Sequence, residues 1–292
     1  MLAGLGYAAL AYICWGLFPL YFHHIAQVNA FEVILHRSVW SLVFVWGLLA
    51  VMRRGAWLAP FLAEPRKLGR FALSAGLLTV NWTLYVWSVN HGHVLEASLG
   101  YFINPLVNVL LGTTVLGERL RRAQWLALAV AAAGVLWLTL SVGRPPWIAL
   151  FLALSFGGYG LLRKTTSLGG LEGLALETLA IAPIAVPALA WLGLHGSSAL
   201  NHAEPALVGW LLFSGPLTAI PLLLFAAGAR RVPLATMGVM QYLSPTLQFL
   251  LGVFWFHEHI DPARLAGFGF IWAALLIYTG EGLITLRRAA RA

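Results

Sequence analysis

The chain has 292 residues, of which 60% are hydrophobic and only 10% are charged, and its mean hydropathy is +0.83. Soluble globular domains carry about 25% charged residues, so this composition excludes a soluble protein and indicates an all-α protein of the lipid bilayer. The net charge of +8 would suit a nucleic-acid partner only if the basic residues gathered on a solvated domain, and here they lie in short gaps between apolar runs. We therefore expect no nucleic-acid partner.

Ten apolar runs follow one another along the chain, and each is about 20 residues long, enough to cross a hydrocarbon core of about 30 Å as a helix. The runs cover residues 4–22, 32–52, 70–90, 94–116, 123–142, 146–162, 171–194, 206–227, 233–256 and 263–286. The first run lacks a preceding basic residue and a small-x-small cleavage pattern, so we interpret it as a retained helix. The expected fold is an all-α membrane protein with ten transmembrane helices.

The basic residues alternate between the gaps. Fifteen of the 18 Lys and Arg residues lie in the gaps after the second, fourth, sixth and eighth runs and in the C-terminal tail. Arg144 and Arg264 lie in the other gaps, and Arg37 lies inside the second run. Because cytoplasmic loops are enriched in Lys and Arg, both termini are expected in the cytoplasm.

The chain contains an internal duplication. The segment Leu99–Leu120 returns as Val239–Ile260, at an offset of 140 residues. Equivalent positions of these segments carry Asn104-Pro105 and Ser244-Pro245, Gly112 and Gly252, and Glu118 and Glu258. The offset divides the chain into repeats over residues 1–142 and 143–292, each with five runs. Since five is odd, the second repeat enters the membrane from the opposite face, so the repeats are expected to be inverted.

A proline inside an apolar helix frees a backbone carbonyl, which a membrane helix tolerates where a neighbouring helix or a water-lined cavity satisfies that group. Pro105 and Pro245 lie at equivalent positions of the two repeats. Paired interruptions of this kind point to a binding site near the middle of the bilayer, between the repeats. A proline kink retained for packing alone is the alternative.

Two charged residues are buried in the runs at equivalent positions. Arg37 lies about two turns inside the second run, and at the offset of 140 it corresponds to Glu177. Charges inside a membrane are costly, so we expect both to act in gating or coupling, or to form a structural ion pair. The sequence leaves open whether they compensate one another or pair with other groups. Protonation of Glu177 would make protons a coupling partner.

Neutral polar and aromatic residues recur on one face of several runs. The candidate residues for binding a small-molecule substrate are Trp15, Asn81, Tyr85, Asn104, Asn108, Gln241 and Gln248. Amide, hydroxyl and indole groups suit a neutral or zwitterionic, partly aromatic solute better than a phosphate or a metal ion. Hydrogen bonds between helices, or packing in the case of Trp15, are the alternative roles of these side chains.

No motif in the sequence indicates catalysis, a cofactor or a metal. His257-Glu258-His259 lacks the i, i+4 spacing that places two histidines on one helix face, and the sequence has no phosphate loop, nucleophile elbow or HExxH motif. The single cysteine, Cys14, excludes an intrachain disulfide. We therefore expect no enzyme, no cofactor and no metal site.

Six segments carry a family resemblance: Trp15-Gly16, HRSVW (36–40), GYFINPLVNVLLG (100–112) with the GERL that follows, SFGGYGLLRK (155–164), LETL (176–179) and QYLSPTLQFLLGVF (241–254). In order and spacing they resemble the RarD subgroup of the EamA family, in the drug/metabolite transporter superfamily. The resemblance implies a bacterial inner-membrane permease with ten helices in two EamA repeats, and the subgroup name is associated with chloramphenicol sensitivity. Relatives in the superfamily carry amino acids, drugs or other metabolites. One departure is His257, where the first repeat has Gly117.

We therefore expect a small-molecule transporter that exports or exchanges a neutral or zwitterionic metabolite or an amphiphilic drug by alternating access. The alternative is a membrane sensor or assembly partner that binds a solute without transporting it. This alternative does not explain the inverted symmetry of the repeats. An intramembrane enzyme ranks third.

Overall fold

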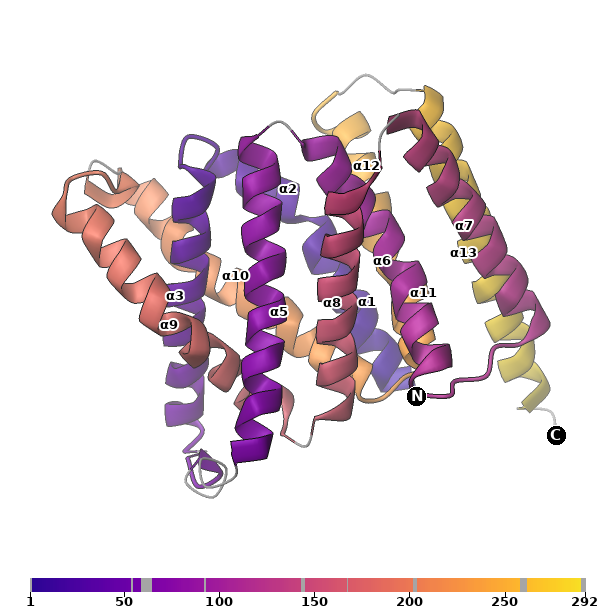
Figure 1. The fold of residues 1–292 in the computed structure, drawn as a ribbon, viewed down its shortest axis with the longest axis horizontal. Coiled ribbons are helices and arrows are strands. Elements are labelled where there is room, and N and C mark those ends of the chain that lie inside the picture. The colour runs from indigo at the N-terminus through magenta and orange to yellow at the C-terminus, as the bar shows by residue number, and fades with distance from the viewer. Residues whose placement is uncertain are drawn as a thin grey trace.

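A computed structural model describes residues 2–53, 55–58, 65–91, 93–142, 145–166, 168–201, 204–257 and 262–289, and these residues form helices joined by short connections (Figure 1). The α-helices are α1 (Leu2–Gly16), α2 (Phe18–His24), α3 (Ala30–Val51), α5 (Pro65–Asn90), α6 (Val94–Thr114), α7 (Arg122–Val142), α8 (Trp147–Thr165), α9 (Gly170–Leu194), α10 (Pro205–Ala229), α11 (Leu234–Gln241), α12 (Leu243–Phe254) and α13 (Pro262–Ala289). A 3₁₀ turn, η1 (Ala199–Asn201), precedes α10.

Each of the ten apolar runs falls on one helix or on a pair of helices, so the all-α prediction is confirmed for the described residues. Six of these segments are long and apolar enough to cross a membrane by length and composition. They are Leu2–His24, Ala30–Val51, Arg122–Leu140, Gly170–Leu194, Pro205–Ala229 and Leu265–Gly282. A count of ten spans remains a prediction.

Two of the ten runs, each expected as one helix, are divided into two helices. The first run breaks at Leu17, and Pro19 then occupies the first turn of α2, where a missing N–H is no loss. The run 233–256 breaks at Tyr242, which places Pro245 in the first turn of α12. The equivalent Pro105, by contrast, lies inside the continuous helix α6. The two repeats therefore differ in backbone at equivalent positions.

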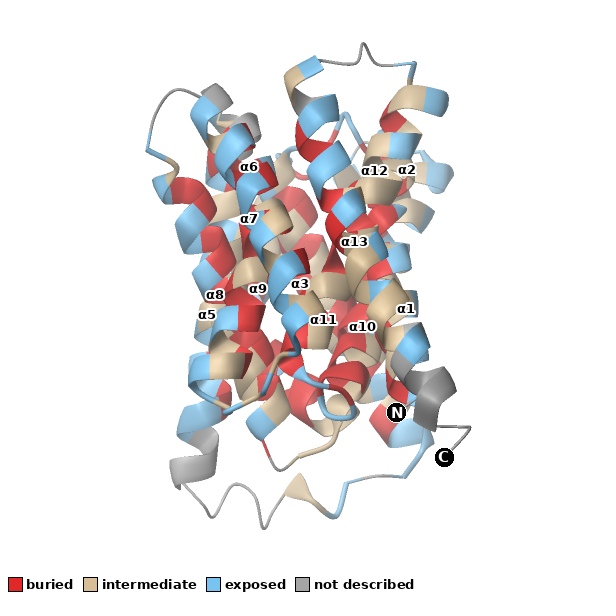
Figure 2. Ribbon diagram, turned by 90° about the vertical axis from the view of Figure 1, so that its right-hand side faces the viewer, coloured by how far each residue is buried: buried red, intermediate tan, exposed pale blue. Residues whose placement is uncertain are grey.

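Close packing between helices rests on small residues. A Cβ atom on Gly238 of α11 would lie 2.6 Å from the carbonyl oxygen of Pro105 on α6, and one on Gly228 of α10 would lie 3.1 Å from the backbone nitrogen of Ala8 on α1. The largest buried cluster includes aromatic rings of α1, α8 and α10, namely Tyr12, Tyr159 and Phe225. The same cluster also contains residues of α3, α5, α9 and α11, so the core lies in the interior of the bundle, where Figure 2 shows many buried residues.

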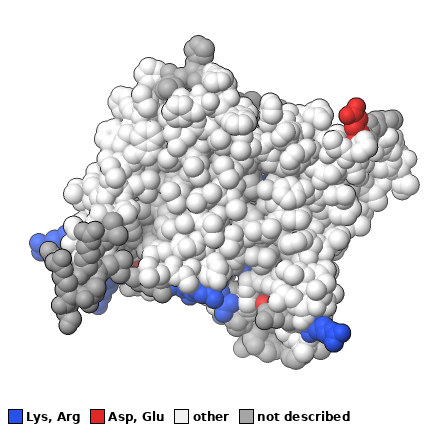
Figure 3. Space-filling model, turned by 180° about the vertical axis from the view of Figure 1, so that it is seen from behind, with Lys and Arg blue, Asp and Glu red and all other residues white. Residues whose placement is uncertain are grey.

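The outer surface of the bundle is apolar, and its Lys and Arg residues gather at one end. Large exposed hydrophobic side chains occur around the perimeter, among them Leu10, Val43, Leu110 and Leu136. Figure 3 shows Lys and Arg along the lower edge of one face, which is also the edge where α1 begins and α13 ends in Figure 1. We call this edge, which carries Arg121, Lys164, Arg230 and Arg231, the basic end, and the opposite edge the far end.

Candidate functional site

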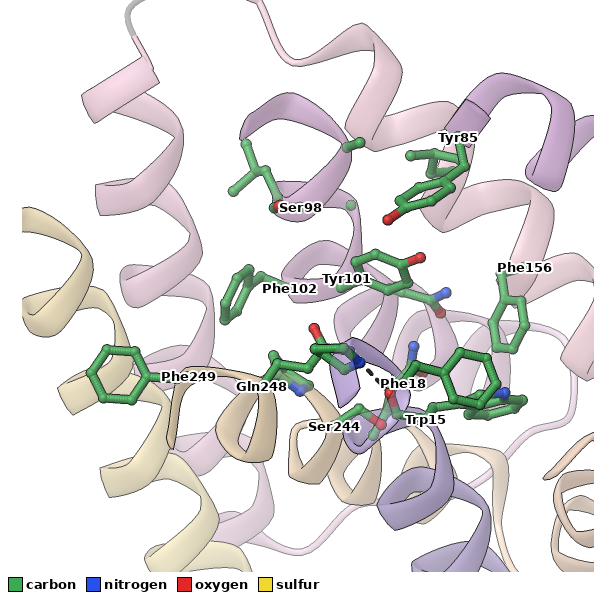
Figure 4. Close-up of a pocket in the computed structure, with 18 of the residues that line it drawn as sticks. Trp15, Phe18, Tyr85, Ser98, Tyr101, Phe102, Phe156, Ser244, Gln248 and Phe249 are labelled. Atoms are coloured by element: carbon green, nitrogen blue, oxygen red, sulfur yellow. Dashed lines mark hydrogen bonds between the residues drawn. The ribbon is translucent and has the colours of Figure 1, made fainter. Parts of the chain in front are cut away.

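A cavity of about 580 Å³ lies among the helices of both repeats (Figure 4). Its walls come from α1, α2, α3, α5, α6, α7, α8, α10, α11, α12 and α13. The part of α6 that contributes is its first half, from Ala97 to Asn104, and the part of α13 is its beginning, at Ala263 and Phe268. Both helices begin at the far end (Figure 1). The cavity therefore occupies the half of the bundle that faces away from the basic end.

The structure brings most of the sequence-predicted site residues together at this cavity. The lining includes Trp15, Arg37, Asn81, Tyr85, Asn104, Gln241 and Gln248. Asn108 and Glu177 do not belong to the lining, and both are completely buried. A role of the lining residues in substrate binding remains a proposal.

The floor of the cavity is a hydrogen-bonded group of three amides. Asn108 Nδ2 on α6 donates to Asn104 Oδ1 at 3.1 Å and to Gln241 Oε1 on α11 at 3.0 Å. Asn108 lies one turn deeper than Asn104, and α11 covers it, because Gly238 packs against its side chain. The deeper amide thus fixes the two amides above it and joins α6 of the first repeat to α11 of the second.

Other lining residues also hold helices together. Asn81 Nδ2 donates to Leu152 O and to Ser155 Oγ, both at 2.9 Å. Gln248 Nε2 donates to Trp15 O at 3.1 Å, the contact drawn dashed in Figure 4. The interhelical role that the sequence left open therefore applies to Asn81 and Gln248, while their carbonyl oxygens remain available to the cavity.

Arg37 is held in the cavity wall by aromatic rings. Its Nε donates to Thr218 Oγ1 at 2.9 Å, and its guanidinium carbon lies 5.1 Å from the ring centroid of Trp82 and 5.5 Å from that of Phe18. Such cation–π contacts stabilise a charge away from water. Among the described residues, no Asp or Glu lies within salt-bridge distance of Arg37.

Glu177 pairs locally instead of with Arg37. Its Oε1 accepts a hydrogen bond from Ser74 Oγ at 2.5 Å and lies 3.5 Å from Arg163 Nη1, while Tyr159 donates to Oε2 at 3.4 Å. Arg163 is itself only 2% exposed, and its Nη2 donates to Gly170 O at 2.8 Å. Of the alternatives that the sequence left open, the structure shows local pairing.

The carboxylate of Glu118 forms hydrogen bonds between the two repeats at the basic end. Glu118, just after α6, accepts hydrogen bonds from Leu234 N at 2.6 Å and Ala235 N at 2.9 Å, the first backbone groups of α11. Lys164 Nζ lies 3.7 Å from Glu118 Oε1 and donates to the carbonyl oxygens of Ala229 and Val232. The equivalent Glu258 lies outside the described residues.

The candidate residues taken from the sequence include Trp15 and Tyr85 but leave out the other aromatic residues of the cavity. Tyr101 lines it and is 42% exposed, and Phe102, Phe249 and Phe268 form one of its walls. The sequence places Tyr101 on one helix face with Asn104 and Asn108, although Tyr101 is not among the candidate residues above. The phenylalanines could not be identified from the sequence, since the rest of the apolar runs is equally hydrophobic.

The sequence predicts no metal site at His257-Glu258-His259, and the structure describes only the first of these three residues. Glu258 and His259 lie outside the described residues, and the described residues contain no group of three or more His, Cys, Asp or Glu side chains that could hold a metal ion.

Comparison with known proteins agrees with a transport protein. The model of the EamA-like transporter family matches residues 2–140 and again residues 145–280. The protein RarD of Streptomyces exfoliatus is 50% identical over 98% of this chain and 91% of its own length, and an uncharacterised transporter of Pseudomonas aeruginosa is 45% identical over 95% and 93%. A solved crystal structure with 19% identity has the same fold, with a TM-score of 0.72 over 94% of this chain and 96% of that one. The chain, with its two matching units and a cavity between them, belongs to the EamA-like transporter family.

Proposed function

We propose that the chain is a bacterial inner-membrane permease that exports or exchanges a small neutral, zwitterionic or amphiphilic solute by alternating access. The observation that carries the proposal is the cavity itself, because its lining comes from both repeats and the buried Asn108 of α6 beneath it donates a hydrogen bond to the lining residue Gln241 of α11. A site on the boundary between two repeats can be exposed to either face when the repeats rock against each other.

The proposal includes ten spans, inverted repeats over 1–142 and 143–292, and cytoplasmic termini. The two family matches end and begin on either side of the 142/143 boundary. The gathering of Lys and Arg at the basic end supports a cytoplasmic location for that end (Figure 3). The cavity would then face outward in this conformation.

The closed side has two contacts that would open during transport. The first is the close packing of Gly238 on Pro105, and the second is the hydrogen bonding of Glu118 to the beginning of α11. Both contacts join α6 or the segment after it to α11, and these helices occupy equivalent positions of the two repeats. A symmetric rearrangement of the repeats would break these contacts and form equivalent contacts at the far end.

The charged residues have different parts in this proposal. Arg37 lines the cavity and would contact the solute or gate it. Glu177 would influence coupling only through the buried network with Arg163 and Tyr159. Protons are therefore a partner to be tested rather than assumed.

Flux measurements in proteoliposomes test the proposal. Uptake and counterflow of a labelled panel, comprising aromatic and other neutral amino acids and chloramphenicol-like amphiphiles, should be saturable and should depend on the protein. Asn104→Ala should reduce the flux and leave thermal unfolding nearly unchanged. Leu110→Ala, on the exposed side of the same helix, is the matched control. Binding without flux would favour the sensor alternative.

A further inference from the structure

The cavity has two chemically different ends. Figure 4 places Tyr85 and Phe156 at one side of the cavity and Phe249 and Phe102 at the other. Arg37, through its contact with Trp82, belongs to the side of α5, which also carries Tyr85. A solute that fills such a cavity is expected to be amphiphilic.

The polar end offers hydrogen-bond donors together with a positive charge. Arg37 uses Nε to bind Thr218, and its two terminal nitrogens have no partner among the described residues. These nitrogens are not among the buried polar atoms that lack partners, so they are reached from the cavity that Arg37 lines. A guanidinium with two free nitrogens matches the geometry of a carboxylate.

The floor amides add further donors. Because Asn108 donates to the oxygens of both Asn104 and Gln241, each of these two side chains is left with an NH₂ group to present. Neither NH₂ group has a partner among the described residues, and neither is sealed from the cavity. Amide NH₂ groups of this kind favour a solute group that accepts hydrogen bonds.

The apolar end is built of phenyl rings in tilted and edge-to-face contact. The ring centroids of Phe249 and Phe268 are 4.4 Å apart, and those of Phe102 and Phe268 are 5.2 Å apart. Leu138 and Val253 also line the cavity. The apolar end fits an aromatic or branched aliphatic body.

The described lining contains no Asp or Glu, so an ammonium group in the cavity would have no opposite charge to meet. We propose that the cavity binds an amphiphilic monoanion, with its carboxylate at Arg37 and the NH₂ groups of Asn104 and Gln241, and its apolar body against Phe249. This inference rests on the proposed function and narrows its substrate class. It predicts that a carboxylate alone is recognised better than a zwitterion.

Four probes that share one apolar body test the head-group preference on the full chain in lipid nanodiscs. They are 3-phenylpropanoate, its primary amide, 3-phenylpropylamine and phenylalanine, and binding is followed by calorimetry. We expect the carboxylate to bind about tenfold or more tightly than the amide and the amine, since hydrogen bonds to a charged group are among the strong ones. Phenylalanine should lie between the carboxylate and the amine.

Variants separate the charge effect from a general loss of structure. Arg37→Gln should remove the preference for carboxylate over amide, and Arg37→Lys should keep part of it. Asn104→Asp retains the acceptor that Asn108 needs, so it should fold, reject the carboxylate and improve amine binding. Arg231→Gln removes a charge at the basic end and should change nothing. Phe249→Ala should weaken all probes alike.

Equal binding of carboxylate and amide, no carboxylate binding at millimolar concentration, or an unchanged preference in both Arg37→Gln and Asn104→Asp would overturn the anion inference. Flux in proteoliposomes distinguishes this from failure of the proposed function. Flux of the amide without any preference for the carboxylate keeps the transporter and removes the anion site, whereas selective carboxylate binding without flux keeps the site and removes the transporter.

Discussion

Arg163 on α8 and Glu177 on α9 form a buried ion pair, with 3.5 Å between Nη1 and Oε1. Neither side chain is reached by solvent to more than 2%. Breaking such a pair on one side leaves an uncompensated buried charge, which costs about 3–5 kcal/mol. Glu177→Ala should therefore lower the free energy of unfolding by about that amount, measured by denaturant unfolding in mild detergent.

The double variant Arg163→Met/Glu177→Leu is the control for this prediction. It removes both charges and should be less destabilised than Glu177→Ala alone, since no buried charge is left without its partner. If Glu177→Ala were as stable as the unaltered protein, the pair would have no structural role. A separate measurement tests whether Glu177 couples transport to protons. If it does, the Glu177→Gln variant should still catalyse counterflow, but a pH gradient should no longer accelerate its transport.

Glu118→Ala should loosen the closed side. The variant removes the acceptor of two backbone hydrogen bonds at the beginning of α11 and the ionic contact with Lys164. We expect the basic end to open more often, so maleimide should label a cysteine introduced by Ala235→Cys severalfold faster. The experiment uses a Cys14→Ser background, because Cys14 is free and partly exposed.

The matched control for Glu118→Ala is Glu204→Ala, which removes an exposed acid before α10 whose side chain makes no capping hydrogen bond. It should leave the labelling of the introduced cysteine unchanged. Equal labelling rates in the Glu118→Ala and control proteins would mean that Glu118 does not hold the basic end closed.

Gly238→Ala should damage the contact between α6 and α11. The added Cβ would lie 2.6 Å from Pro105 O and 2.9 Å from Asn108 Cβ, both atoms of a packed helix. Overpacking of this kind costs about 1–3 kcal/mol, and the helices would move apart at the floor of the cavity. The melting temperature and the transport rate should both fall.

Gly76→Ala on α5 is the control for the glycine prediction, because nothing lies within 4 Å of its added Cβ. Alanine is favoured over glycine inside a helix by about 0.5–1 kcal/mol, so this variant should be neutral or slightly stabilised. The same loss of stability in both variants would contradict the steric explanation.

Asn108→Asp should change which groups of Asn104 and Gln241 face the cavity, although residue 108 itself does not line the cavity. The new side chain, when ionised, only accepts hydrogen bonds, so the NH₂ groups of Asn104 and Gln241 would turn toward it and present their oxygens to the cavity. Affinity for a carboxylate probe should fall while affinity for its amide changes little. Asn108→Ala, which merely loses the bonds, should weaken both probes, and identical effects of the two substitutions would refute this ordering role.

The helices could be predicted from the sequence because bilayer thickness sets their length and hydrophobicity alone marks them. The break between α11 and α12 at Tyr242 could not be predicted from the sequence. Asn104-Pro105 and Ser244-Pro245 look equivalent in sequence, yet only the second lies next to a broken helix. Which proline remains inside a helix depends on what the surrounding helices satisfy, and that is a property of the packing.

The candidate site was predicted at the level of helix faces rather than of individual contacts. Asn104 and Asn108 share one face of α6, but α11 covers the deeper one and leaves the other at the cavity. The repeat offset of 140 residues relates Glu177 to Arg37, but in the structure the ion-pair partner of Glu177 is Arg163 on the preceding helix. Side chains at related positions need not meet, because local packing decides which groups they contact: Glu177 pairs with Arg163, whereas Arg37 contacts Thr218 and aromatic rings.

The absence of an acidic neighbour around Arg37, within the described residues, has an electrical consequence. With a bound monoanion the site is neutral, and without it the site carries one positive charge. A membrane potential acts on that charge with about 2.3 kcal/mol per 100 mV for a full crossing, and an interior-negative potential draws it toward the cytoplasm. We expect voltage to drive the return of the empty transporter, which then loads inside and releases its anion outside.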